Sequence, residues 1–300
     1  AYFVLFTASS CFLFMAAAGA FPSVNIGLSS GGKVLTNSPF MLHNLTMTYC
    51  VFSVMLTAAA MGQAIYQDYD HQMAALFFVT PLRRRQYLFG RYLSALVYLV
   101  ILFSSFGLGF FLGSILPGTE ARLVGPNRFA AFAMPYFVGV IPNQIIAGSL
   151  FFALAARTRK MIGVYTGSVV LLAVYLIAGS VDVDVEYKWL AGLLDPFGTF
   201  ASQFMSEYWS IAEKNTRLLG WEGMLLYNRV LWLALSLVAT VALLWKLRLG
   251  HPEEAGAVDL DRERAPTGRP LPVVPLDQRR PPSLPILGAT LFGWLAYALK

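Results

Sequence analysis

The chain has 300 residues, of which 57% are hydrophobic and only 13% carry a charged side chain. Soluble globular domains carry about 25% charged residues, so this composition excludes a water-soluble fold. The net charge of +6 does not indicate a nucleic-acid partner, because no basic stripe stands on a water-exposed domain. The two cysteines both lie in apolar sequence and form neither a disulfide framework nor a zinc-binding spacing.

Seven segments contain no Asp, Glu, Lys or Arg, and each is close to or above the roughly 20 residues that a membrane span requires. Spans must be helical here, because lipid offers no partner to the open backbone groups of a sheet edge. The predicted spans are 2–21, 44–66, 92–116, 129–155, 161–180, 229–247 and 284–299. The sequence therefore predicts an all-α polytopic membrane protein.

The Lys and Arg residues between these spans alternate in number from one loop to the next. Segments 67–91, 156–160 and 246–283 hold fourteen of them, whereas the alternate loops hold seven, counting Arg229 at the start of the sixth span. By the positive-inside rule, the first set of segments faces the cytoplasm. The longest loop, 181–228, is then expected on the opposite side of the membrane.

No enzyme signature is present in the sequence. Gly27–Lys33 fits the start of a phosphate-binding loop, but Val34 replaces the Ser or Thr that would hold magnesium, and no strand precedes it. The histidines, His43, His71 and His251, lie in separate regions, whereas a zinc hydrolase needs three converging ligands. We therefore expect that this chain is not an enzyme and binds no cofactor or metal itself.

The cytoplasmic loop after the second span contains a segment, 68–82, that we name the coupling segment. Two acidic residues can cap the N-terminus of a short helix, three apolar residues recur at helical spacing, and a Thr-Pro pair ends the helix. These residues are Asp68, Asp70, Met73, Leu76, Phe77, Thr80 and Pro81. An apolar helix face on a cytosolic loop must be covered by lipid or by a partner.

A basic cluster follows the coupling segment where the chain re-enters the membrane. It consists of Arg83, Arg84, Arg85 and Arg91. Anchoring to anionic lipid, at about 1 kcal/mol per residue, and direct contact with a partner both account for this cluster.

Two further features lie inside the predicted spans. The pairs Gly109/Gly113 and Gly163/Gly167 have the spacing that lets helix backbones approach closely, so we expect them to be packing devices. In the fourth span, two prolines and the polar pair of Asn143 and Gln144 interrupt apolar sequence. Such polar residues face protein or a water-filled path. An interhelical hydrogen bond and a place in a translocation path are equally consistent with this pattern.

Loop 181–228 and the C-terminal region differ in composition from the spans. The loop is acidic and rich in aromatic residues, which predicts short amphipathic helices at the membrane interface, in a capping or a binding role. Segment 250–283 holds seven prolines and predicts a cytoplasmic linker, partly extended as polyproline II. We therefore expect a six-helix domain at 1–249 and the start of a further transmembrane unit at 284–300. The apolar ends indicate a piece of a longer polypeptide.

The coupling segment and the Tyr-Leu-Phe-Gly-Arg sequence at 87–91 resemble the loop between the second and third helices of type-2 ABC exporter permeases. The resemblance extends over most of residues 1–249. Four later motifs are similar to those of a bacterial subgroup whose chains carry two six-helix units and often a zinc-aminopeptidase-like C-terminal domain. These motifs are Asp195–Gly198, Tyr208–Trp209, Ala212–Thr216 and Asn228–Trp232.

The resemblance implies a six-helix type-2 transmembrane domain that forms the translocation path of an ATP-driven exporter in the bacterial cytoplasmic (inner) membrane. It implies an ABC ATP-binding subunit in two copies, which carries ATP and Mg and contacts residues 68–82. A second permease half, in this chain or another, and membrane lipids complete the expected partners. The alternative is a non-transporting anchor or assembly scaffold for a fused extracytoplasmic enzyme. The apolar, aromatic interior suggests lipid-like or amphipathic cargo.

Overall fold

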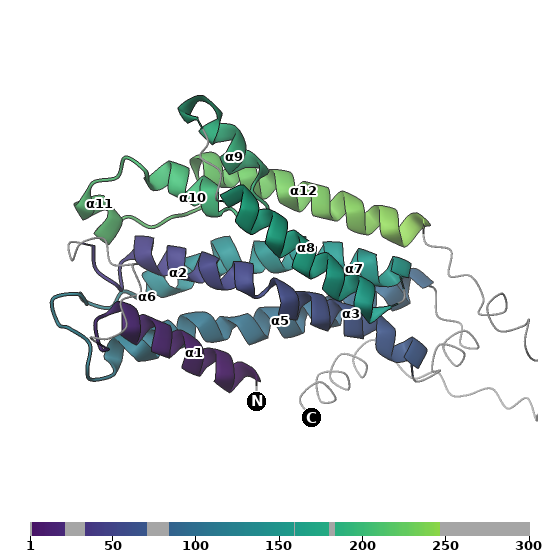
Figure 1. The fold of residues 1–300 in the computed structure, drawn as a ribbon, viewed down its shortest axis with the longest axis horizontal. Helices are drawn as coiled ribbons and strands as arrows, with labels where there is room; N and C mark the ends of the chain where they lie inside the picture. The colour runs from purple at the N-terminus through teal and green to yellow at the C-terminus, as the bar shows by residue number, and fades with distance from the viewer. Residues whose placement is uncertain (1, 22–33, 71–83, 159, 180–183, 247–300) are drawn as a thin grey trace, which may run out of the picture. The chain divides into compact units, whose positions relative to one another are not determined.

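The computed structural model of the chain describes residues 2–21, 34–70, 84–158, 160–179 and 184–246 (Figure 1). These residues form helices joined by turns, and no strand occurs among them, which confirms the all-α fold class. The helices are α1 (Tyr2–Ala17), α2 (Pro39–Phe52), α3 (Val54–Asp70), α5 (Arg84–Ile115), α6 (Phe129–Pro135), η1 (Tyr136–Val140), α7 (Ile141–Thr158), α8 (Met161–Gly179), η2 (Val185–Tyr187), α9 (Lys188–Leu194), α10 (Thr199–Ser206), α11 (Ile211–Thr216) and α12 (Gly223–Lys246).

Several helices are long and apolar enough to cross a membrane. The described part of the chain contains four such spans, and α2 with α3 makes a fifth if the bent pair is counted as one. The four unbent spans are Gln86–Ile115, Phe129–Thr158, Met161–Gly179 and Gly223–Leu243. Helix α1 has 16 residues, about 24 Å at 1.5 Å per residue, which is shorter than the roughly 30 Å hydrocarbon core. The predicted linker 250–283 and span 284–299 lie outside the described residues.

The predicted second span, 44–66, is not one straight helix. Helix α2 begins at Pro39, where Ser38 Oγ accepts from the Met41 amide at 3.2 Å. The chain then bends by 48° between α2 and α3. Ser53 Oγ donates to the Cys50 carbonyl at 2.8 Å at this break, and such side-chain bonds to backbone compete with regular helix geometry. The predicted span 44–66 therefore corresponds to two helices joined by a bend.

The fourth span contains an irregular turn where the sequence has its prolines. Helix α6 ends at Pro135 and continues as the π-helical segment η1 before α7 begins. Proline removes one backbone donor, and its ring clashes with the carbonyl four residues earlier, which disturbs regular α-helical winding. Tyr136 Oη donates to the Val100 carbonyl at 2.6 Å and ties this segment to α5.

Helices α1 and α5 pack closely along much of α1, and they lie side by side in Figure 1. A Cβ at Gly109 would overlap Ser10 Oγ and the Thr7 carbonyl, and one at Gly113 would lie 3.0 Å from the Cys11 carbonyl. The packing role predicted for this glycine pair is confirmed. In α8, a Cβ at Gly167 would lie 2.6 Å from Leu154 of α7.

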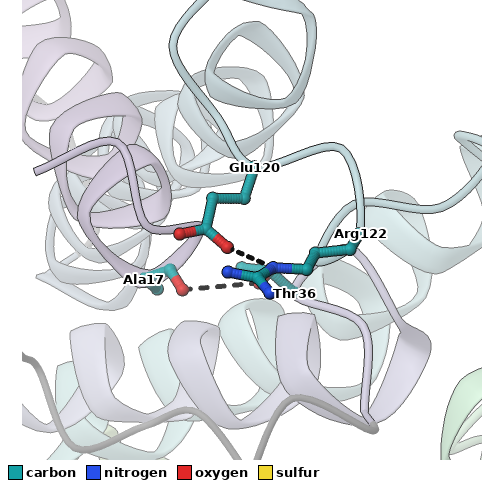
Figure 2. A network of polar contacts seen from close by, with 4 residues as sticks. All are labelled: Ala17, Thr36, Glu120 and Arg122. Atoms are coloured by element: carbon teal, nitrogen blue, oxygen red, sulfur yellow. Dashed lines mark hydrogen bonds and ion pairs between the residues drawn. The ribbon is translucent and has the colours of Figure 1, made fainter. Parts of the chain in front are cut away.

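The turns at the expected non-cytoplasmic end are joined by polar contacts. Figure 2 shows Thr36 Oγ1 donating to the Ala17 carbonyl at 3.5 Å and Arg122 paired with Glu120 at 2.7 Å. The Thr36 amide also donates to the Leu123 carbonyl at 2.8 Å. The two contacts of Thr36 link the end of α1, the residues before α2 and the turn after α5, whereas the Arg122–Glu120 pair lies within that last turn. The glycine-rich sequence Gly27–Lys33 lies outside the described residues.

Candidate functional site

The structure describes only the first three residues, 68–70, of the predicted coupling segment. Asp68 and Asp70 belong to the last turn of α3, and their role as caps of a following helix stays a prediction. The residues of the segment outside the described ranges are Met73, Leu76, Phe77, Thr80 and Pro81.

The sequence predicted that the basic cluster lies in a loop. The structure instead places part of the cluster in a helix. Helix α5 begins at Arg84, eight residues before the predicted span, so Arg84, Arg85 and Arg91 occupy helical positions. Arg91 Cζ lies 5.8 Å from the centre of the Tyr87 ring, a cation–π distance. Arg83 lies outside the described residues. Contact of this cluster with lipid or with a partner stays a prediction.

The two polar residues of the fourth span are buried and hydrogen-bonded to neighbouring helices. Gln144 Oε1 accepts from Thr57 Oγ1 of α3 at 2.7 Å. Asn143 Oδ1 accepts from Arg229 Nη1 of α12 at 2.8 Å. Both contacts correspond to the packing alternative for these residues. A place for Asn143 and Gln144 in a translocation path stays a prediction.

Arg229 is not the boundary residue that the sequence suggested. It lies in the second turn of α12, which begins six residues before the predicted sixth span, and its side chain is 0% exposed. Besides Asn143, it donates through Nη2 to the carbonyl of Phe197 in the turn between α9 and α10. A fully buried guanidinium requires such partners, because an unpaired buried charge costs several kcal/mol.

The turn that receives Arg229 has the sequence Asp195-Pro196-Phe197-Gly198. The Asp195 carboxylate accepts from the amides of Phe197 at 2.8 Å and Phe200 at 2.7 Å, and so caps the start of α10. Gly198 has φ +76°, and a Cβ there would overlap the Arg229 guanidinium. The glycine is therefore needed both for the backbone angle and for the approach of the arginine.

Two more residues of α12 contact the same turn. Asn228 Nδ2 donates to the carbonyls of Gly192 at 2.8 Å, Leu193 at 3.1 Å and Asp195 at 2.7 Å. Trp232 Nε1 donates to Leu193 O at 3.2 Å. We name Asn228, Arg229 and Trp232 the carbonyl clamp, because all three donate to carbonyl groups that the end of α9 and the following turn leave unpaired. The sequence motifs at 195–198 and 228–232 thus form one site.

The electrostatics of this site centre on one buried ion of each sign. Burial raises the pKa of the Asp195 carboxyl, and the amides of Phe200 and Phe197 and the charge of Arg229 oppose that shift. Arg229 also lies within electrostatic range of His43 and Cys50 on α2. The site therefore joins α2, α7, α12 and the turn before α10. No group of His, Cys, Asp and Glu able to hold a metal ion occurs among the described residues.

The loop between α8 and α12 forms short helices, as its composition predicted. Helix α11 begins with a capping box, in which Ser210 Oγ accepts from the Glu213 amide and the Glu213 carboxylate accepts from the Ser210 amide. Large aromatic side chains of the loop are exposed, with Trp189 at 52% and Tyr208 at 84%. Their position at the membrane interface and the capping or binding role of the loop stay predictions.

Comparison with known proteins identifies the family. The model of the ABC-2 family transporter proteins matches residues 35–205, which include α2, α3, α5 to α10 and the turn that the carbonyl clamp holds. No curated protein and no solved structure matches the chain. Because the family match covers more than half of the chain, and its helices are apolar enough to span a membrane, the chain belongs to the ABC-2 transporter family and is a membrane-spanning permease subunit of an ABC transporter.

Proposed function

We propose that this permease forms the translocation path of an ATP-driven exporter and is driven by a separate ATPase subunit that contacts the coupling segment. The family match carries this proposal, because it extends through residues 68–82 and the basic cluster that follows. The same segment directly continues α3 on one side and precedes α5 on the other. A force that the ATPase applies to the coupling segment would therefore act on both α3 and α5.

The apolar residues of the coupling segment supply the contact in this proposal. Met73, Leu76 and Phe77 recur at helical spacing, so they form one face that fits a groove on the ATPase, where flexible Met and rigid Phe both pack well. Two copies of the ATP-binding subunit would carry ATP and Mg. The chain itself contributes the path and binds neither.

The exposed helices support a second permease half. Only 11% of the apolar window of α8 and 22% of that of α12 is buried within the chain. Their uncovered apolar side chains must meet lipid or another permease half, in the same polypeptide or another. Asn143, bonded to α12, and Gln144, bonded to α3, would face the path only in a conformation in which these interhelical bonds have exchanged partners. Cargo of lipid-like or amphipathic character fits such apolar walls.

The test is co-purification of the full chain with an ATPase subunit from its native membrane, followed by ATP turnover with candidate amphipathic substrates. Phe77→Asp places an unpaired charge on the proposed contact face and should abolish substrate-stimulated turnover by weakening the contact with the ATPase, while membrane insertion remains normal. Arg84→Ala, which removes one charge from the basic cluster, is the matched control and should change turnover little. Full stimulated turnover and normal assembly of Phe77→Asp would contradict the coupling assignment.

The second candidate function is a non-transporting anchor or scaffold for a fused extracytoplasmic enzyme, such as a zinc-aminopeptidase-like domain beyond residue 300. The resemblance of the motifs at 195–198 and 228–232 to those of a bacterial subgroup favours it. Purification from a bacterial cytoplasmic membrane without any ATPase, together with peptidase activity of the longer polypeptide, would favour the scaffold over the exporter.

A further inference from the structure

Two irregular helix segments lie at the same depth in neighbouring helices. Above the break at Ser53, Met47 of α2 contacts the fourth span: a Cβ at Gly139 would overlap Met47 Cε. Below the break, Thr57 of α3 contacts Gln144 of α7 through their 2.7 Å hydrogen bond. The break at Ser53 therefore lies opposite the junction of η1 and α7. Both helices change direction or winding at one level.

The helices that contact α2 differ from those that contact α3, although α5 packs against helices on both sides of this level. On one side, α2 contacts α6, η1, α10 and α11. We name α2 and these four segments the outer set. On the other side, α3 contacts α7 most extensively, and we name α3 and α7 the inner set. Figure 1 shows α10 and α11 near the end at which α2 begins, away from the end of α3. Each set has packing contacts of its own, and α5 lies against both.

Arg229 joins the two sets across the breaks through the strongest polar contacts, beside a weaker 3.8 Å contact from Asn143 Nδ2 to Met47 Sδ of α2. Its Nη2 donates to Phe197 in the turn before α10, and its Nη1 donates at 2.8 Å to Asn143 in the first turn of α7. We propose that the paired breaks at Ser53 and η1 form a hinge between the outer and inner sets, and that Arg229 is the positioning residue that holds this hinge in the described conformation through Asn143. Hinges absorb such motion at helix ends and irregular turns.

Unpartnered polar atoms beside Arg229 make the second conformation of this hinge accessible. Within the part of the chain that the structure describes, Arg229 Nε, Asn228 Oδ1 and both ring nitrogens of His43 are buried without a hydrogen-bond partner. Each such atom costs free energy as long as it is kept from water. Opening the hinge would expose these atoms and recover part of that cost, which offsets the loss of the Arg229–Asn143 bond.

The hinge is argued from contacts alone, and only its use in transport rests on the proposed function. Helix α3 continues directly into the coupling segment. A displacement that an ATPase imposes there would therefore tilt the inner set, while the carbonyl clamp keeps the turn between α9 and α10 attached to α12. Arg229 then determines how readily the tilt reaches the non-cytoplasmic side.

The test measures distances between pairs of spin labels on the full chain in lipid nanodiscs, without ATPase or substrate. Cys11 is replaced by serine so that it is not labelled, and Cys50 is kept because it is buried. One pair joins exposed sites across the hinge, at Tyr208 and Gln63. A second pair lies within the outer set, at Thr48 and Tyr208, and a third within the inner set, at Gln63 and Leu150. Asn143→Ala removes the acceptor for Arg229 and also the weak 3.8 Å donation from Asn143 Nδ2 to Met47 Sδ, whereas Asn143→Asp removes only the second of these.

Asn143→Ala should increase, at least about threefold, the fraction of molecules in which the distance between the cross-hinge labels differs from that of the described conformation. This factor corresponds to the free energy of an average interhelical hydrogen bond in a membrane. The two pairs within a set should not change. Asn143→Asp keeps an acceptor and adds an opposite charge, so it should restore the original distribution. Gln144→Ala, which removes a bond inside the inner set, is the matched control and should leave the cross-hinge distance unchanged.

An unchanged cross-hinge distance in Asn143→Ala would overturn the hinge, as would equal changes in all three pairs, which indicate general loosening. Arg229→Ala, if it folds, should match Asn143→Ala. Because these measurements need no partner, their failure leaves the permease proposal intact. Conversely, absence of a co-purifying ATPase would contradict the exporter and leave the hinge standing.

Discussion

At the scale of single residues, the site depends on side chains that satisfy backbone groups at helix ends. Asp195 accepts from two amides at the start of α10, and the carbonyl clamp donates to the carbonyls at the end of α9. Helix ends leave several backbone groups without partners, and inside a membrane protein few waters replace them. These residues are therefore fixed by the geometry of two short helices.

We expect Asp195→Ala to lower the free energy of unfolding by about 1–3 kcal/mol, because it leaves the buried amides of Phe197 and Phe200 without an acceptor. Asp195→Asn keeps one acceptor oxygen and should lose less. Thermal unfolding of the detergent-solubilised protein measures both. Glu207→Ala removes only a half-exposed pair with Lys188 and should change stability by less than about 0.5 kcal/mol; an equal loss in this control would argue against a specific role for Asp195.

Gly198→Ala should be more damaging than its small size suggests. The residue has φ +76°, a region that costs an L-residue about 1–2 kcal/mol, and the added methyl group would displace the Arg229 guanidinium. We expect a clear drop in the unfolding temperature. Gly90→Ala is the control, because nothing lies within 4 Å of a Cβ there and alanine favours a helix. A stable Gly198→Ala protein would show that Arg229 can take another position.

At the scale of elements, proline and hydroxyl side chains decide where the helices are irregular. Pro135 precedes the π-helical segment, and Ser53 bonds to the backbone at the bend between α2 and α3. The prolines marked the first irregularity in the sequence, but nothing marked the second. A serine in an apolar run is compatible with a straight helix, and only the packing of α2 on one side and α3 on the other selects the bend.

Thr57 and Gln144 should stabilise each other across α3 and α7. A double-mutant cycle with Thr57→Val and Gln144→Leu is expected to give a coupling of about 0.6 kcal/mol, with about 1.7 kcal/mol as the upper range seen for membrane proteins. Unfolding in mixed micelles measures it. The pair Thr48→Val and Gln144→Leu is the control, because Thr48 bonds only to its own helix; coupling there would mean that the effect is indirect.

At the scale of the whole molecule, the charges between the spans determine orientation. The turn at 156–160, which we expect on the cytoplasmic side, is basic, whereas the loop at 181–228 is acidic, and these two regions flank α8 in the chain. The positive-inside rule then orients all the spans together. If one predicted span did not cross the membrane, the orientation of every later span would be reversed. Measuring which side of the membrane each loop faces therefore tests all the predicted spans together.

Single cysteines placed at Arg157 and Tyr208, both exposed, should react with a membrane-impermeant thiol reagent from opposite sides. In the Cys11→Ser background, Tyr208→Cys should be labelled in intact cells. Arg157→Cys should be labelled only after the cells have been permeabilised. The unsubstituted Cys11→Ser protein gives the background from buried Cys50. Labelling of Arg157→Cys in intact cells would reverse the predicted topology.

The sequence by itself determined the membrane class, the helical fold and the packing role of Gly109 and Gly113, because each follows from local composition or spacing. It also suggested that Asn143 and Gln144 had partners, since polar groups in a span must be satisfied. It misjudged Arg229, which its position at the end of an apolar run made indistinguishable from an interfacial charge.

Only the tertiary structure decided what Arg229 contacts and why Gly198 is a glycine. Arg229 meets residues 86 and 32 positions away in the chain, and no local pattern encodes which carbonyl or amide a buried guanidinium will meet. The bend at Ser53 and the π-helical segment came to lie at one depth for the same reason. Local rules fix what each segment can form, whereas the pairing of segments is fixed by close packing and by the need to satisfy every buried polar group.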